Sequence, residues 1–459
     1  MIARHDIQGN ILRGYARHLH AAYLLTRIED EEKARAFLTR LIDEDRIATD
    51  GDWGDPPQTR LNLALTYAGL RRLRVDPDPD PDSDPFLRCP DFREGMQARA
   101  REQLGDLGAN DPDHWDPALR EEIHALFTVY GRTADTRRDA ARALTGELAD
   151  AGMAIVHHQR ADLLKSGREH FGFRDGFSQP ALAGVSEERR SRRGEGVQRR
   201  RLPLGDERWR EVKLGEFVLG HEDEDGVVPG AGKPLLLNGT FMVWRKLQQD
   251  VDAFTRWIEA HAGADKTAQD TLRAKILGRW PNGDSLIRRP ASGTYGDGDS
   301  GDPRQHDLQI NDFSYAGDAA GVHCPLGAHV RRSNPRDALG FRTERTRRNR
   351  IIRRGLPYVD CDETRGLIFV CFNASIARQF EQIQGNWLMG GDTFGLGAER
   401  DFLTAGLDPG QPSVRMTIQG DRAHPPSFVT RTEQFVTVRG GHYLFVPGLD
   451  ALRTIAGGG

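Results

Sequence analysis

The chain has 459 residues, about three times the roughly 150 residues of an average domain, so two domains or one large domain are expected. Its 64 lysine and arginine residues nearly balance 68 aspartate and glutamate residues, and a net charge of -4 gives no positive field for a nucleic acid backbone. The longest apolar runs, such as 367–372, are far shorter than the roughly 20 residues of a membrane span. We therefore predict neither a nucleic acid nor a membrane as a partner.

The N-terminal stretch and the cysteines bear on the compartment. MIARHDIQGNILRGY has neither the apolar core of a secretory signal nor a twin-arginine motif, so we expect a cytoplasmic protein. The four cysteines are scattered, with no C-x-x-C zinc pattern and no C-x-x-C-H motif for covalent haem. We interpret them as reduced, mostly buried thiols.

The first third of the chain alternates strands and helices. Strands are predicted at 20–28, 61–67, 123–130 and 154–164, and helices at 29–47, 92–104 and 134–148. A proline and aspartate run at 76–84 predicts a surface loop. With one extra helix, this is the ferredoxin-like pattern, an antiparallel sheet with helices on one face.

The rest of the chain repeats part of this alternation. Strands are predicted at 215–220, 240–244, 366–372, 428–438 and 443–446, and helices at 251–261 and 375–384. We therefore predict an α+β fold of two ferredoxin-like domains with antiparallel sheets, at 1–170 and 171–459, the second opening with a linker and loop at 171–214. The basic insertion 186–201 is predicted as a solvated loop, with a docking patch for an acidic partner as the alternative.

Two short segments carry residue types suited to chemistry. In EHFGFRDGFSQP (169–180), Gly172 and Gly176 flank Asp175, which fits either a structural turn or an acid presented into a cavity. In HCPLGAHVRRSNPR (323–336), a histidine in an apolar setting precedes three arginines. It fits either a hydrogen-bonded core histidine or a metal ligand beside an anion site.

Haem iron and a third segment add to this picture. One histidine is enough for haem iron because the porphyrin supplies the other four ligands, and arginines pair with its propionates. In NRIIRRGLPY (349–358), Arg353 follows two isoleucines, which indicates a strand end that delivers a guanidinium. The preceding basic cluster at 342–350 is predicted to be exposed.

Taken in order, FGFRDG, AHVRRSNPR and IIRRGLPY resemble the dye-decolorizing peroxidase family. DIQGNILRGY, GRWPNGDSL, NDFSYAGD, LIFVCFNASIARQFEQIQ and RGGHYLFVPG agree, so the resemblance spans nearly the whole chain. It implies two ferredoxin-like domains, with a noncovalent haem b held mainly by the C-terminal one. It also implies a haem-dependent peroxidase that reduces hydrogen peroxide and oxidises small phenolic or dye-like donors one electron at a time.

The resemblance also implies roles for individual residues. His329 is the proximal iron ligand, Asp175 the distal acid/base and Arg353 the distal charge stabiliser. Arg336 reaches a haem propionate, and Asp408 is the acidic partner of the proximal imidazole.

Other readings stay open. The alternative function is a haem-binding or iron- and haem-handling protein on the same scaffold with incidental peroxidase activity. A flavin or nucleotide enzyme is poorly supported, since no phosphate-binding glycine motif occurs. Trp280, Tyr358 and Trp387 fit either core aromatics or electron relays. Gly355 stands where some family members have an asparagine. The size of the chain is compatible with a homo-oligomer.

Overall fold

The computed structural model describes residues 2–15, 17–51, 57–74, 86–176, 178–185, 200–201, 207–208, 211–291, 310–311, 313–339, 344–421 and 425–457. The predicted loop at 76–84 and nearly all of the basic insertion at 186–201 lie outside these residues. No helix among the described residues is long and apolar enough to cross a bilayer. All four cysteines are described, and none of the four forms a disulfide.

The N-terminal half forms a ferredoxin-like unit. Its strands are β1 (His20–Ile28), β2 (Thr59–Leu65), β3 (Ala125–Gly131) and β4 (Met153–Asp162). They pair antiparallel in the order β4-β1-β3-β2. Successive residues of a strand point to opposite faces, and both faces of β1 are buried: Leu24 joins one apolar core and Tyr23 another. Helices α2 (Glu31–Asp43) and α7 (Ala134–Asp150) pack with the first of these cores.

The C-terminal half has the same strand arrangement, with its last strand next to its first. Its strands are β7 (Thr240–Gln249), β8 (Ile352–Arg353), β9 (Leu356–Val359), β10 (Arg365–Asn373) and β13 (Val436–Val446). β13, β7 and β10 pair in that order, and both β8 and β9 pair with β10, all antiparallel. The prediction of two antiparallel ferredoxin-like α+β units is therefore confirmed.

The two units share one sheet and its cores. Leu65 of β2 pairs with Phe445 of β13, which joins the units into a nine-stranded sheet. At the other end β4 packs against β9, and Gln159 Nε2 donates to Asp360 Oδ1 at 2.9 Å. The sheet thus curls until its ends meet, with one core inside it and another between its outer face and the helices. Because both cores draw on both halves, the boundary at 170/171 stays a prediction.

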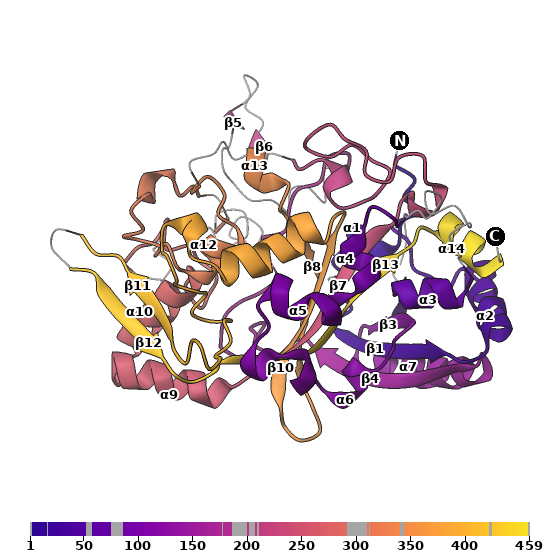
Figure 1. Ribbon diagram of the computed structural model, residues 1–459, viewed down its shortest axis with the longest axis horizontal. Helices are drawn as coiled ribbons and strands as arrows, with labels where there is room; N and C mark the ends of the chain where they lie inside the picture. Colours follow the sequence, from indigo (N-terminus) through magenta and orange to yellow (C-terminus); the bar gives the residue numbers. More distant parts are fainter. Residues whose placement is uncertain are drawn as a thin grey trace.

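The other elements surround this sheet (Figure 1). The helices are α1 (Gly9–Leu12), α3 (Tyr67–Arg72), α4 (Pro90–Glu94), α5 (Met96–Leu104), α6 (Pro117–Arg120), α9 (Val251–Ala262), α10 (Lys266–Leu277), α12 (His329–Ser333), α13 (Glu344–Arg347), the π-helix η7 (Ala377–Leu388) and α14 (Leu449–Gly457). The hairpin of β11 (Val414–Ile418) and β12 (Ser427–Arg431) lies with α9 and α10 at the left end of Figure 1, while α2, α3 and α14 lie at the right.

Three predicted elements are wrong in detail. The helix predicted at 92–104 is broken into α4 and α5 at Gly95, whose φ of +79° cannot continue a helix. The strand predicted at 215–220 is a 3₁₀ turn at Leu214–Glu216, and Gly220, with φ +82°, turns the chain back. The strand predicted at 428–438 is the end of β12 and the start of β13, separated by a turn.

Gly69 in α3 offers a test of the packing between helix and sheet. A Cβ on Gly69 would lie 2.0 Å from the backbone oxygen of His124, which is fixed in the chain. We expect Gly69→Ala to lower the free energy of unfolding by about 1–3 kcal/mol because of this overlap, although alanine normally favours a helix. Denaturant unfolding measures the change. The control is Gly146→Ala in α7, where a Cβ meets nothing within 4 Å and stability should rise. Equal stability of the two variants would contradict this packing.

Candidate functional site

The candidate site is a cavity of about 280 Å³ lined mainly by the C-terminal half, with Asp106, Asn110 and Glu169 added from before residue 171. Its floor is apolar and comes from alternate residues of three strands, Leu247, Leu367, Phe369, Val436 and Val438. The helix η7 adds Phe380, Ile383 and Leu388. The remaining lining includes nine charged or titratable side chains, Asp106, Glu169, Arg174, Asp175, Arg245, Arg279, His329, Arg350 and Arg353. An apolar cavity with a few converging polar groups is the usual form of a ligand site.

His329 enters the cavity from the first residue of α12 and is held from behind by Asp401. Its Nδ1 lies 3.0 Å from Asp401 Oδ2, and the Asp401 side chain is fully buried. Asp401 Oδ1 also accepts hydrogen bonds from the backbone N–H and the hydroxyl of Thr404, both at 2.7 Å. With Nδ1 engaged, Nε2 is the ring nitrogen available to a metal.

The charge of Asp401 is stabilised by its surroundings. Burial alone would raise the pKa of this carboxyl, but the interaction with His329, assisted by Arg332 and Thr404, lowers the pKa to about 2. The carboxylate is therefore ionised at ordinary pH and favours a proton on the His329 Nδ1 that faces it.

The prediction that Asp408 is the acidic partner of the histidine is wrong. Asp408 pairs with Arg400 at 3.3 Å, and its other oxygen accepts backbone hydrogen bonds from Gly410 and Gln411. It stabilises a tight turn and is absent from the cavity lining. Asp401 lies seven positions earlier on the same segment, and sequence reasoning missed it. Its only local signal is the Asp-x-x-Thr spacing that the hydrogen bond to Thr404 uses.

Asp175 and Arg353 meet at the cavity, as the sequence motifs suggested. Arg353 Nη2 lies 3.6 Å from Asp175 Oδ1, and the two side chains are 39% and 42% exposed. At this exposure such a pair contributes at most about 1 kcal/mol to stability, so the contact between the two groups is weak. Gly172 (φ +92°) and Gly176 (φ +85°) adopt the left-handed backbone that this loop requires.

Gln179 ties the Asp175 loop to the Arg353 strand, and sequence reasoning missed it too. Its Oε1 accepts from the backbone N–H of Arg353 at 3.0 Å, and its Nε2 donates to the backbone oxygen of Arg353 at 3.2 Å. The amide thus takes the place of a neighbouring strand along the edge of β8.

Nearby, a Cβ at Gly355 would lie 2.6 Å from the Ile368 backbone oxygen, so glycine fits where some family members have asparagine.

Further arginines make the cavity electropositive. Arg279 donates to Asn311 Oδ1 at 2.8 Å, and burial together with Arg336 and Arg353 lowers its pKa to about 9. Burial and the charge of Arg353 also lower the pKa of Arg350 to about 9. Closely placed cations of this kind favour an anionic group in the cavity.

Other predicted residues lie outside the cavity lining. Arg336 donates to the backbone oxygens of Asn311 and Phe313 and stacks 3.6 Å from the Phe313 ring centre, so its propionate role stays a prediction. Trp280, Tyr358 and Trp387 are all buried in apolar clusters, and a relay role for them also stays a prediction.

Comparison with known families finds two matches. Residues 6–161 match the model described as DyP dimeric alpha+beta barrel domain, and residues 219–394 match Dyp-type peroxidase, C-terminal. Together the two matches cover well over half of the chain.

Similar proteins and structures agree. The dye-decolorizing peroxidase msp1 of Mycetinis scorodonius is 26% identical over 98% of this chain and 87% of that protein. The multifunctional dye peroxidase DyP2 of Amycolatopsis sp. is 27% identical over 98% and 95%. The structure of an ancestral D-type dye decolorizing peroxidase superposes with a TM-score of 0.79 at 27% identity, covering 98% of each chain. A dye-decolorizing peroxidase in complex with 2,6-dimethoxyphenol has a TM-score of 0.80 at 24% identity, covering 99% of this chain and all of the other.

Proposed function

This chain belongs to the dye-decolorizing peroxidase family of haem peroxidases, and we propose that its cavity holds a noncovalent haem b with His329 as the proximal iron ligand. The observation that carries the proposal is the buried Asp401, which fixes a single histidine in an apolar cavity that also contains Asp175 and Arg353.

The residues present fit this group. An apolar floor suits the porphyrin faces, and the cationic Arg279 and Arg350 suit its propionates. Among the described residues no cysteine lines the cavity, which agrees with noncovalent binding. When bound, haem supplies the iron and the redox equivalents for reduction of peroxide.

The side chains divide the remaining work. Asp175 accepts the proton from the peroxide oxygen that binds and returns it to the oxygen that leaves as water. Arg353 stabilises the negative charge that builds on the leaving oxygen. Asp401 orients His329 and raises its basicity, which would strengthen its hold on a bound iron. With haem bound, two one-electron donations from phenolic or dye-like donors would return the enzyme to its resting state.

The direct test is a stopped-flow mix of haem-loaded protein with hydrogen peroxide, followed by a phenolic donor. We expect a rapid spectral change on mixing with peroxide and its reversal by the donor. Slow reaction with peroxide, together with ready release of iron or haem, would support a haem-handling protein instead.

Asp401→Asn is expected to weaken haem binding or peroxide reaction about 10–100-fold, the usual cost of removing a hydrogen-bond partner of a metal ligand. Titration of the haem-free protein with haem and the stopped-flow rate measure this. Asp408→Asn is the control, because Asp408 lies in a surface turn. The reverse ranking of the two variants would restore Asp408 as the partner of His329.

The pH dependence of this contact has a definite sign. The pKa of Asp401 falls from its ordinary 3.8 to about 2 on folding. Its ionised contact with His329 therefore stabilises the fold fully above about pH 4, and this contribution is lost as the pH falls through about 2. In Asp401→Asn the free energy of unfolding should therefore fall less steeply between about pH 4 and pH 2 than in the wild type, as measured by denaturant unfolding at each pH.

We also propose the organisation and setting of the enzyme. Domains at 1–170 and 171–459 are supported by the two family matches on either side of this boundary. The description of the N-terminal model as dimeric supports a homo-oligomer. The four free cysteines support a reducing, cytoplasmic location.

A further inference from the structure

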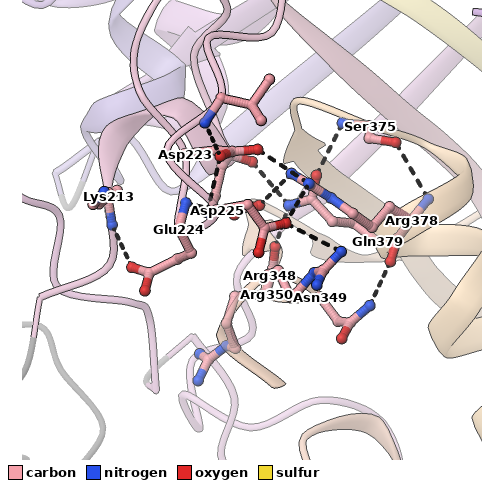
Figure 2. A network of polar contacts seen from close by, with 12 residues as sticks. Lys213, Asp223, Glu224, Asp225, Arg348, Asn349, Arg350, Ser375, Arg378 and Gln379 are labelled. Carbon is pink, nitrogen blue, oxygen red and sulfur yellow. Dashed lines mark hydrogen bonds and ion pairs between the residues drawn. The ribbon is translucent and has the colours of Figure 1, made fainter. Parts of the chain in front are cut away.

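The segment that leads into Arg353 is held by carboxylates far away in the sequence (Figure 2). These belong to the acidic loop, residues 216–225, which follows the basic insertion. Arg347 pairs with Glu224 at 3.1 Å. Arg348 pairs with Asp225 at 3.1 Å (Figure 2). The prediction that the basic cluster 342–350 is exposed is therefore wrong for Arg347, which is 13% exposed, and for Arg350, which lines the cavity, whereas Arg348 is 39% exposed.

Arg378, at the start of η7, lies at the centre of this network. Its guanidinium contacts Glu216 Oε2 at 2.7 Å and Asp223 Oδ2 at 3.1 Å. Both carboxylates are essentially buried, with side chains 0% and 2% exposed. The network thus anchors the first turn of η7 to the acidic loop.

The same turn of η7 holds the backbone before Arg353. The Gln379 Nε2 donates to the Arg350 backbone oxygen at 2.5 Å and to the Glu216 backbone oxygen at 2.8 Å. The Asn349 Nδ2 donates to the Arg378 backbone oxygen at 2.6 Å. Glu216, Arg378, Gln379 and the 349–350 backbone therefore form one connected unit.

Arg353 needs such support because its strand is very short. β8 has two residues, and its sheet register covers only two pairs, Cys371 with Arg353 and Phe372 with Ile352. Gln179 adds two bonds to the Arg353 backbone itself, so the contacts described above act on the stretch just before β8, where movement of the backbone would carry the Arg353 guanidinium with it.

The network is also costly to bury. Burial, together with the nearby Asp223 and Glu224, raises the pKa of Glu216 to about 7 even though Arg378 lowers it. Buried ion pairs of this kind contribute little net stability, so the arrangement is better explained by the geometry it imposes.

We propose that Arg378 and Gln379 are positioning residues for the distal arginine: anchored by the acidic loop, they fix the backbone at 349–350 and so hold the Arg353 guanidinium in the cavity. This inference rests on the proposed role of Arg353. Arg378 itself acts only through that segment and contacts no substrate.

The test is a double-mutant cycle with Arg378→Met and Arg353→Leu in the haem-loaded enzyme, read by the peroxide rate constant and by cyanide affinity. We expect Arg378→Met to lower the rate constant about tenfold and to raise the cyanide Kd about tenfold, and to have no further effect once Arg353 is leucine. In the haem-free Arg378→Met variant, the backbone amides at 349–353 should exchange faster with solvent than in the haem-free wild type.

Two further variants complete the design. Arg46→Met removes a half-buried arginine that pairs with Glu147 in the N-terminal half, and it should leave all three readouts unchanged. Gln379→Leu removes the side-chain hydrogen bonds to the Arg350 and Glu216 backbone oxygens without changing charge. If Arg378→Met does not fold, this variant replaces it, with the same expected changes in peroxide rate constant, cyanide affinity and amide exchange.

The outcomes separate the proposals. Equal losses from Arg378→Met with and without Arg353, or no change in amide exchange, would overturn the positioning role. If Arg353→Leu alone changes neither the rate nor cyanide affinity, the proposed role of Arg353 fails instead.

Discussion

Replacing His329 by alanine is expected to abolish haem binding and to reduce peroxidase activity to the level of free haem. His329 is the only histidine that lines the cavity among the described residues, so no other imidazole there can replace its bond to iron. Absorption spectra of the protein mixed with haem should lack the sharp Soret band of the wild type. Because the substitution leaves a space beside Asp401, imidazole added to the solution should restore part of the band.

The matched control is His323→Ala, six positions earlier on the same segment. The His323 side chain is exposed and is absent from the cavity lining, so haem binding and activity should not change. A wild-type spectrum and activity in His329→Ala would remove His329 as the iron ligand and with it the proposed haem site.

Asp175→Asn and Arg353→Leu are each expected to lower the second-order rate constant for peroxide about 10²–10³-fold, with haem binding retained. The asparagine cannot take up the peroxide proton, and leucine cannot stabilise the leaving oxygen. Because the two groups are 3.6 Å apart and act on the same peroxide, the double variant should lose less than the product of the single losses.

Stopped-flow rates at several peroxide concentrations measure these losses. Arg365→Leu is the control, because this exposed arginine pairs with Asp252 at the far end of β10, outside the cavity lining. If both distal variants react at the wild-type rate, neither residue has the role proposed for it. If only one does, the other carries peroxide activation alone.

Local patterns in the sequence were sufficient for most secondary structure. The strand predicted at 20–28 is confirmed at both ends, and the helix predicted at 251–261 differs by one residue. Periodicity is set by the residues of each element, so it is readable before folding. Gly95 shows where prediction from periodicity fails, because one glycine with positive φ divides a segment whose apolar spacing remains helical.

In the candidate site, too, residues in local motifs could be predicted and residues that act through distant contacts could not. Asp175, His329 and Arg353 stand in short motifs, and the structure brings all three to one cavity. Asp401 stands outside these motifs, and Gln179 lies within 169–180 with no signal of its role, because the importance of both comes from contacts with residues 72 and 174 positions away. The sequence analysis named only Asp408 as the acidic partner, and only the fold shows that Asp401, on the same segment, faces the histidine.

From its sequence alone, this protein was determined to be a two-unit α+β chain with the residue types of a haem peroxidase. The tertiary structure decided how the units close into one sheet, which acid supports His329, and how the acidic loop reaches the strand of Arg353. Motifs and periodicity are local and survive in the unfolded chain. Ion pairs such as Glu216 with Arg378 join residues 162 positions apart, and they exist only once the whole chain has packed.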